Sequence, residues 1–330
     1  MKSRRWEKRK ISKIMGTLVM CVGVLILVAY SMQGMFKQET TGDLIPVSVI
    51  VSDSAGDKWT ALRQGLEQAS KDYHIELNFV STSDFHNAKE EKDLIEREIE
   101  NGAKGILYQT TFGGTSAIEN LTNTPVFLLE TDVEPQEIYA VAQLDHKRIG
   151  SQLAQALKDT LGQDLEKTRI GVLCGNQSVL SNKQRLEGLI EALPPHEANY
   201  VWMLSTGQQT LTEKPVAAGI EQRNLDVLIA LNNDDTELAV DYVLEQNSSY
   251  TQIYGVGTSE KLIYYLDQGM IADLIVPLHF QMGYQAMEQM AKYLTGSAPR
   301  MESVTVGNLV VDKERLYDDE NQKIIFPNVQ

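Results

Sequence analysis

Cysteine is nearly absent from this chain. Only Cys21 and Cys174 occur among 330 residues, and Cys21 falls within an apolar run near the amino terminus. A disulfide-stabilised scaffold is therefore excluded, because the main part of the chain holds a single thiol. Aromatic residues make up only 7% of the chain. The fold must rest on an ordinary aliphatic core, which a chain of this length is large enough to form.

Positive charge is scarce outside the amino terminus. The chain carries −15 in total, whereas residues 1–13 hold seven basic residues and one acidic residue, so the remainder carries −21. A surface of this sign repels the phosphates of nucleic acids and of anionic lipids. Nucleic acid is therefore not an expected partner.

Patterns typical of catalysis and of metal binding are also missing. The five histidines are scattered, and no group of His, Cys, Asp and Glu has metal-ligand spacing. There is no glycine-rich phosphate loop and no Gly-x-Ser-x-Gly motif. We therefore expect no enzyme, no cofactor and no metal, although residues distant in the sequence can still meet in space. An enzyme built on the same fold stays open as a remote alternative.

Residues 14–36 form an uncharged apolar run of the length that a membrane-spanning helix needs. The basic residues 1–13 before it should stay in the cytoplasm, and residues 37–43 are a polar linker. We interpret the run as a retained single-pass transmembrane helix in the cell membrane, with the main domain outside the cytoplasm. Two alternatives stay open: a signal peptide cleaved near Ala29, and a lipoprotein modified at Cys21.

Beyond the linker, short apolar segments alternate with segments of helical spacing. Leu62 and Leu66 share one helical face, and Leu153 and Leu157 share another. This alternation is typical of parallel sheets, and the number of units favours an α/β fold with two doubly wound lobes and a ligand cleft at the carboxyl ends of the strands. The predicted strands are 46–52, 75–81, 105–109, 125–130, 139–144, 169–174, 200–204, 227–230 and 252–256.

Several stretches, taken in order, resemble the type I periplasmic sugar-binding proteins. They are 52–59 (SDSAGDKW), 125–132 (PVFLLETD), 144–150 (LDHKRIG), 185–189 (RLEGL), 229–239 (IALNNDDTELA), 254–257 (YGVG) and 267–269 (DQG). The resemblance implies one lobe of residues 44–144 plus 278–306, and a second of residues 145–277 plus 307–330. Bacterial repressors share this outer fold, but here an apolar run stands where their DNA-binding segment lies.

The resemblance also implies a set of ligand contacts, because charged and planar groups bind sugar hydroxyls and aromatic rings cover the sugar face. The candidates are Asp57, Lys58, Trp59, Phe112, Glu130, Arg185, Asn233, Asp234 and His279.

Each of the stronger candidates has a structural alternative. Arg185 is either a ligand contact or a solvated helix residue. Asn233 and Asp234 lie in the run Asn232-Asn233-Asp234-Asp235, which allows a one-residue register error. One residue of this run is either a ligand contact or a helix cap. Trp59 is either a stacking residue or part of the core, and His279 is either a contact or a structural histidine.

Three departures from the family pattern bear on the ligand. Gly257 stands where sugar binders carry an Asp, Pro277 stands where several carry Gln, and no second aromatic residue accompanies Gln208 and Gln209. We expect a solute-binding protein that closes on a small polar ligand, a carbohydrate, and serves an ABC permease or a sensor histidine kinase. The alternative is a ligand-independent interaction module on the same fold.

Overall fold

Two parallel sheets organise the part of the chain that the computed structural model describes. This part comprises residues 44–51, 57–81, 87–110, 117–118, 121, 123–130, 139–206, 225–245 and 251–325. Every helix in these ranges is too short or too polar to cross a lipid bilayer. The predicted tail (1–13), transmembrane helix (14–36) and linker (37–43) lie outside them.

The first sheet has the strand order β11-β5-β4-β3-β1-β2, and all of its described neighbours are parallel. Since the strands run the same way, their carboxyl ends lie along one edge. The strands are β1 (Ile45–Val51), β2 (Ile75–Ser81), β3 (Gly105–Tyr108), β4 (Val126–Leu129), β5 (Val141–Leu144) and β11 (Val304–Val306).

The second sheet has the order β12-β10-β9-β8-β6-β7. It is parallel except for β12, which pairs antiparallel with β10. The strands are β6 (Arg169–Leu173), β7 (Asn199–Leu204), β8 (Val227–Ala230), β9 (Gln252–Val256), β10 (Ile271–Pro277) and β12 (Asn308–Asp312).

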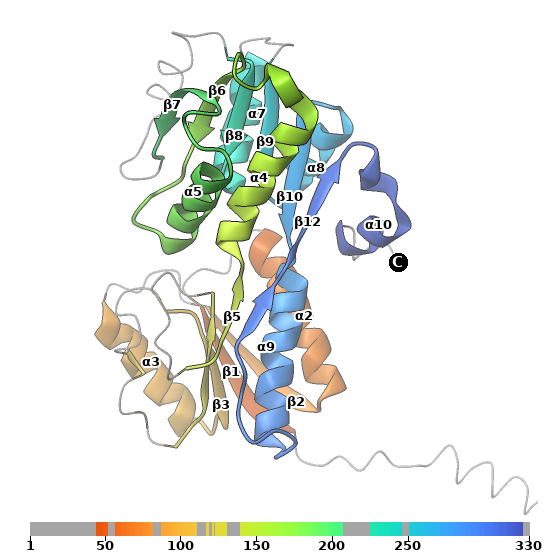
Figure 1. Ribbon diagram of the computed structural model, residues 1–330. Coiled ribbons are helices and arrows are strands. Elements are labelled where there is room, and N and C mark those ends of the chain that lie inside the picture. Colours follow the sequence, from red (N-terminus) through yellow and green to blue (C-terminus); the bar gives the residue numbers. More distant parts are fainter. Residues whose placement is uncertain are drawn as a thin grey trace, which may run out of the picture. The chain divides into compact units, whose positions relative to one another are not determined.

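Helices alternate with the strands and cover the sheets (Figure 1). The described α-helices are α2 (Asp57–Asp72), α3 (Ala88–Glu100), α4 (His146–Leu161), α5 (Leu180–Ala192), α7 (Asn233–Glu245), α8 (Glu260–Asp267), α9 (His279–Leu294) and α10 (Asp319–Ile325). Two short 3-10 turns, η2 (Gly162–Asp164) and η3 (Arg315–Tyr317), complete the described helical elements.

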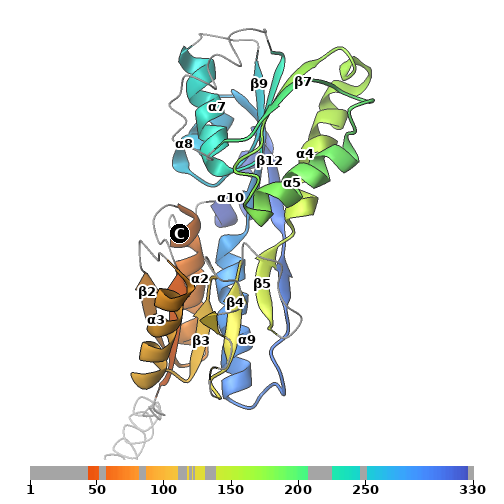
Figure 2. The ribbon, with the colours of Figure 1, turned by 90° about the vertical axis from the view of Figure 1, so that its left-hand side faces the viewer.

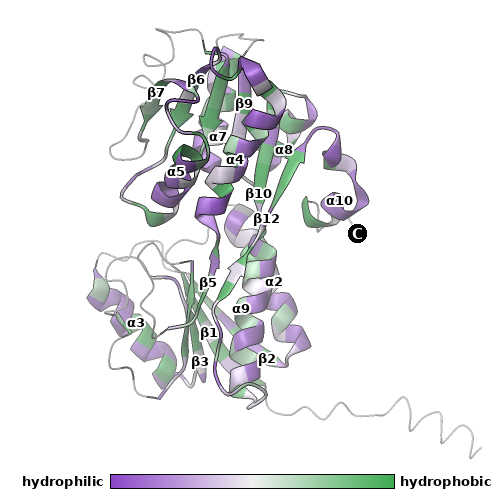
Figure 3. Ribbon diagram, in the orientation of Figure 1, coloured by the Kyte–Doolittle hydropathy of each residue, from purple (hydrophilic) through white to green (hydrophobic). Residues whose placement is uncertain are grey.

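The predicted α/β fold with two parallel-sheet lobes is confirmed. Each predicted strand appears within one or two residues of its expected bounds. Strands β10, β11 and β12 were not predicted from the sequence, nor was the antiparallel pairing of β12 with β10. Central strands such as β3, β4 and β8 are buried throughout, whereas the edge strand β7 is half-exposed. In Figure 3 the strands are mostly hydrophobic, whereas the helices carry both hydrophobic and hydrophilic residues.

Glycines bring two pairs of helices into close contact. In the pair α2–α9, a Cβ atom added to Gly65 would overlap the carbonyl oxygen of Phe280, and one added to Gly283 would overlap that of Leu62. In the pair α4–α5, Gly150 and Gly188 meet the backbone of the opposite helix in the same way. Each pair therefore packs backbone against backbone, one pair on each sheet.

The chain leaves one sheet for the other at three places: from β5 into α4, from β10 into α9, and from β11 into β12. Figures 1 and 2 let the reader follow β5 into α4 and β10 into α9. His146 is the first residue of α4, and His279 is the first residue of α9. Both histidines therefore stand where the chain passes between the sheets.

Candidate functional site

Glu130 is the centre of the candidate site. It directly follows β4, has a φ of 31° and is only 6% exposed. A non-glycine residue with positive φ is uncommon, and such strain is concentrated at functional positions. One of its carboxylate oxygens, Oε2, lies 2.5 Å from Nζ of Lys58 in the first turn of α2. The Lys58 side chain is itself 39% exposed, so one end of this ion pair reaches solvent.

A second set of contacts links Glu130 to the other sheet. Its Oε1 lies 3.6 Å from Nε2 of His146. The other ring nitrogen, Nδ1 of His146, accepts a hydrogen bond from Nε of Arg185 at 3.2 Å. Arg185 also donates from a terminal nitrogen to the backbone oxygen of Leu231, at the end of β8, at 2.8 Å. A continuous chain of polar contacts thus runs from β4 to β8.

His279 completes this group. It is 6% exposed, and within the described part of the chain its Nδ1 has no hydrogen-bond partner. Its electrostatic neighbours are Glu130, Lys58 and Arg185. We call Lys58, Glu130, His146, Arg185 and His279 the charged cluster.

Burial decides the protonation states in the charged cluster. Desolvation lowers the pKa of His146 to about 3, helped by the charge of Arg185, and it lowers the pKa of His279 to about 4. Burial alone would raise the pKa of Glu130, but the charge of Lys58 opposes it and holds this pKa at about 2. At neutral pH both imidazoles are therefore neutral and Glu130 is ionised.

The carboxyl ends of the second sheet carry a different, self-contained network. Asp235 in α7 is buried, and it accepts hydrogen bonds from the hydroxyl of Thr206 at 2.6 Å and from Nδ2 of Asn232 at 2.9 Å. Desolvation raises the pKa of Asp235, and these hydrogen bonds oppose the rise. The carboxylate is thus already occupied by groups of the same lobe.

Asn233 and Asp234 differ from the roles expected of them. Oδ1 of Asn233 accepts from the backbone N–H of Thr258 at 3.1 Å and of Ser259 at 3.3 Å, so the side chain joins the start of α7 to the loop between β9 and α8. Asp234 is exposed, and the buried carboxylate belongs to its neighbour Asp235. The helix cap is Asn232, whose Oδ1 accepts from the Asp235 N–H at 2.8 Å.

The space beside Gly257 explains one departure from the family pattern. A Cβ atom added there would overlap Leu262 and would lie 2.7 Å from Oδ1 of Asn233. Asn233 and Leu262 therefore fill the volume that a side chain at this position would need, so an Asp would not fit without rearrangement.

Of the remaining candidates, Trp59 and Arg185 are buried, whereas the side chains of Asp57 and Phe112 lie outside the described ones. Trp59 is 6% exposed and belongs to the hydrophobic core, which favours the core interpretation, although Nζ of Lys58 lies 4.9 Å from its ring centroid. Arg185 was expected to open its helix or to be solvated, but it lies in the second turn of α5 and is buried. Asp57 is the first residue of α2, and its side chain is outside the described ones, as are Phe112, Gln208 and Gln209.

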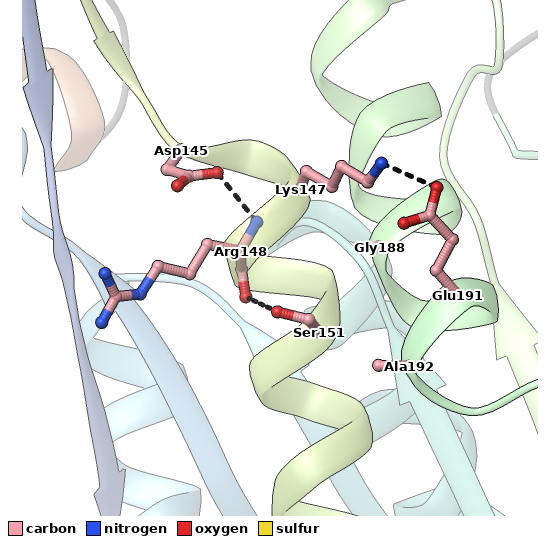
Figure 4. Close-up of a pocket in the computed structure, with 7 residues that line it drawn as sticks. All are labelled: Asp145, Lys147, Arg148, Ser151, Gly188, Glu191 and Ala192. Carbon is pink, nitrogen blue, oxygen red and sulfur yellow. Dashed lines mark hydrogen bonds and ion pairs between the residues drawn. The ribbon is translucent and has the colours of Figure 1, made fainter.

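A separate hollow of about 500 Å³ lies between α4 and α5 (Figure 4). None of the predicted site residues lines it. Lys147 pairs with Glu191 at 2.7 Å, and Asp145 accepts from the backbone N–H of Arg148 at 2.9 Å. Because its polar groups largely satisfy one another, we place the candidate site at the charged cluster instead.

His146 is the main residue that the sequence analysis missed. It stood inside the stretch 144–150 that carried the family resemblance, but it was not named as a contact. A histidine at the first position of a crossover helix was the available signal. Within the described ranges, no three His, Cys, Asp or Glu side chains come together in a way that would hold a metal ion.

The chain belongs to the periplasmic binding protein family. The profile of the periplasmic binding protein domain matches residues 47–298, well over half of the chain. This confirms the resemblance found in the sequence, and members of the family bind solutes rather than turn them over. The domain is therefore extracytoplasmic. No curated protein matches the chain.

Solved structures share the fold at low sequence identity. A carbohydrate transporter solute-binding protein from Agrobacterium radiobacter, in complex with D-arabinose, superposes with a TM-score of 0.72 at 17% identity, covering 86% of this chain and all of the other. The myo-inositol binding protein of Caulobacter, bound to myo-inositol, gives 0.72 at 14%, covering 86% and 98%. A chain of the XylFII–LytSN complex gives 0.67 at 18%, covering 82% and 98%.

Proposed function

We propose that this chain is a membrane-anchored solute-binding protein whose two lobes close on a small polar ligand, a carbohydrate. The observation that carries the proposal is the charged cluster. Lys58, Glu130, Arg185 and His279, all chosen from the sequence as ligand contacts, gather beside the carboxyl ends of strands from both sheets. Ligands of open α/β folds bind at this edge. The ligands of the Agrobacterium and Caulobacter proteins support the carbohydrate class.

The lobes in this proposal are residues 44–144 plus 278–306 and residues 145–277 plus 307–330. The charged cluster lies beside two of the three crossings, since His146 and His279 begin the helices that follow them. Ligand capture and hinge closure therefore act at the same place, and closure presents a new surface to a partner.

Isothermal titration of the full-length chain, purified in detergent, tests the proposal. The panel contains sugars, cyclitols and small polar metabolites. We expect one class to bind with 1:1 stoichiometry and to raise the thermal midpoint of the protein. A folded chain that binds no compound of the panel would sink the proposal.

A second candidate function is a ligand-independent interaction module. It is favoured by the extent to which the candidate contacts are already engaged: Asp235 by Thr206 and Asn232, and Arg185 by His146 and Leu231. In that case the lobes would not need a ligand to hold their arrangement. The same titration separates the two functions, because only the solute binder responds to the panel.

The anchor and the partner belong to the same proposal. Retention of residues 14–36 keeps the binder near a membrane partner at high local concentration. Intact mass together with carbonate washing of membranes distinguishes a retained helix from a cleaved one, and lipidation at Cys21 adds mass. The partner is an ABC permease or a sensor histidine kinase; the occurrence of a related fold in the XylFII–LytSN complex supports a protein partner. Crosslinking in intact cells, followed by mass spectrometry, decides which of the two is engaged.

A further inference from the structure

Arg185 carries a buried positive charge that makes no direct ion pair with a described carboxylate, although the charge of Glu130 acts on it from a greater distance. Its two hydrogen bonds go to neutral acceptors, Nδ1 of His146 and the backbone oxygen of Leu231. Among the described residues, no Asp or Glu oxygen lies within ion-pair distance of its guanidinium. Burial of an unpaired charge is costly, and buried charges are normally paired. A buried guanidinium that no anion contacts directly is therefore able to hold an anionic group of a ligand.

The other members of the charged cluster do not supply that anion. Lys58 and Glu130 form their own ion pair and cancel each other. His146 and His279 are neutral at neutral pH, because burial lowers both pKa values. The net charge of the described cluster is then that of Arg185 alone, in a protein whose total charge is −15.

His279 gives a second, independent indication. Its Nδ1 is buried without a partner in the described part of the chain, although buried polar atoms are nearly always hydrogen-bonded. An imidazole nitrogen can donate a hydrogen bond to an anionic oxygen. The charge of Arg185 acts on His279, so the unpaired nitrogen and this charge belong to one cluster.

Acceptors for a neutral sugar, by contrast, are scarce here. A hydroxyl group both donates and accepts, so neutral sugars need carboxylates or amide oxygens as well as donors. The carboxylate of Asp235 is bound by Thr206 and Asn232, and that of Glu130 by Lys58. These two described carboxylates are therefore already engaged by donors of the protein, which suits a ligand group that only accepts.

We propose that the ligand of this cleft carries a carboxylate and is a sugar acid rather than a neutral sugar, with its carboxylate held by Arg185 and His279. This inference rests on the proposed function as a solute binder. An anionic oxygen between these two groups makes charge-assisted hydrogen bonds, which are about twice as strong as neutral ones.

Matched ligand pairs test the inference on the full-length chain. The pairs are D-glucuronate with D-glucose and D-galacturonate with D-galactose, and D-glucuronamide serves as the neutral isostere of the first acid. We expect the acid of at least one pair to bind about tenfold or more tightly than its neutral partner and than the amide. Raising NaCl from about 0.05 M to about 0.5 M should weaken the binding of the acid but not that of a neutral sugar.

Two variants should change the acid-to-neutral affinity ratio in opposite directions. Arg185→Gln removes the unpaired cation and should lower the acid-to-neutral affinity ratio about tenfold or more. Glu130→Gln frees Lys58 from its partner, makes the cluster more positive and should raise that ratio about threefold to tenfold. Lys147→Gln is the matched control: it removes the same charge as Arg185→Gln from an exposed position beside Glu191, and it should leave the ratio unchanged.

The possible results distinguish the inference of an acidic ligand from the proposed function as a solute binder. If a neutral sugar binds more tightly than its acid, the inference of an acidic ligand is wrong, but the proposed function as a solute binder is supported. Absence of binding by either kind overturns the acidic ligand, and only failure of the whole panel also overturns the proposed solute binding. If Arg185→Gln does not fold, Glu130→Gln decides alone, since a fall in the ratio in that variant contradicts the charge argument.

Discussion

The two crossover helices α4 and α9 are alike in construction and different in use. Each has 16 residues, begins with a histidine after a strand, and carries a glycine four residues later that packs against a partner helix. The imidazole of His146 is engaged on both sides, by Arg185 and by Glu130. The Nδ1 of His279 has no described partner. The two crossings therefore differ in whether the imidazole at the start of the helix is engaged by described neighbours.

Substitutions of the glycines between the paired helices should have the largest effect, and they test whether the two pairs are built alike. Gly150→Ala in α4 and Gly283→Ala in α9 each place a methyl group into the backbone of the partner helix, so each pair must separate. We expect each variant to lower the free energy of unfolding by about 3 kcal/mol. Urea unfolding followed by circular dichroism measures the loss.

Gly307→Ala is the control for both variants, because a Cβ atom there meets nothing within 4 Å. It should change the stability by less than about 0.5 kcal/mol. If one of the helix pairs accepts its alanine as easily as Gly307 does, the two crossings are not built alike and the comparison fails.

The histidines themselves should behave differently when they are replaced. His146→Leu leaves Nε of Arg185 without its acceptor, and we expect a loss of about 2 kcal/mol in the free energy of unfolding. His279→Leu removes a buried nitrogen that already lacks a described partner, so the loss should stay below about 1 kcal/mol. Equal losses in urea unfolding at pH 7.5 would show that His279 is as fully bonded as His146.

Most of the fold could be predicted from the sequence because buried parallel strands are short apolar runs. Strands such as β3, β4 and β8 therefore appeared at their expected places. The missed strands lack this signal: β10 contains Asp273, and β11 and β12 are half-exposed. Their pairing is set by residues far away in the sequence.

The candidate site could be predicted only at the level of residue type. Glu130 attracts attention because a charge directly after a buried strand needs a reason, and Arg185 because it stands in a stretch that resembles the family. That His146 lies between them depends on packing across a crossing, which no local pattern encodes. Likewise, the choice between Asp234 and Asp235 depends on helix phase, and burial selects Asp235.

The same histidines predict a fall in stability with acid. In the unfolded chain a histidine binds its proton near pH 6.5, but the folded state resists protonation until about pH 3 at His146 and about pH 4 at His279. Protons therefore favour the unfolded state over this interval. We expect the free energy of unfolding to decrease as the pH falls from about 6.5 to about 4, by up to about 1.4 kcal/mol per pH unit for each histidine.

Unfolding titrations between pH 7.5 and 4 check this slope in the unmodified chain and in the two leucine variants. His146→Leu and His279→Leu should each flatten it by a similar amount, because both imidazoles are buried and neutral. Glu130, with its pKa held at about 2, adds a loss of the same sign only below about pH 4.5. A slope that neither variant changes would mean that these imidazoles are not the groups that titrate.

The smallest expected effect concerns the surface contacts that accompany the two helix pairs. In α2–α9, Tyr284 donates to Asp72 at 2.9 Å and Tyr73 donates to Glu288 at 2.5 Å, whereas α4–α5 has the exposed ion pair of Lys147 with Glu191. Tyr284→Phe and Tyr73→Phe should each cost about 0.5 kcal/mol of unfolding free energy, since the groups stay solvated. Lys147→Gln should cost nothing measurable, because exposed ion pairs contribute little. If Lys147→Gln lowered the free energy of unfolding more than either tyrosine variant, the ion pair rather than the glycine contacts would be the main stabilising feature of α4–α5.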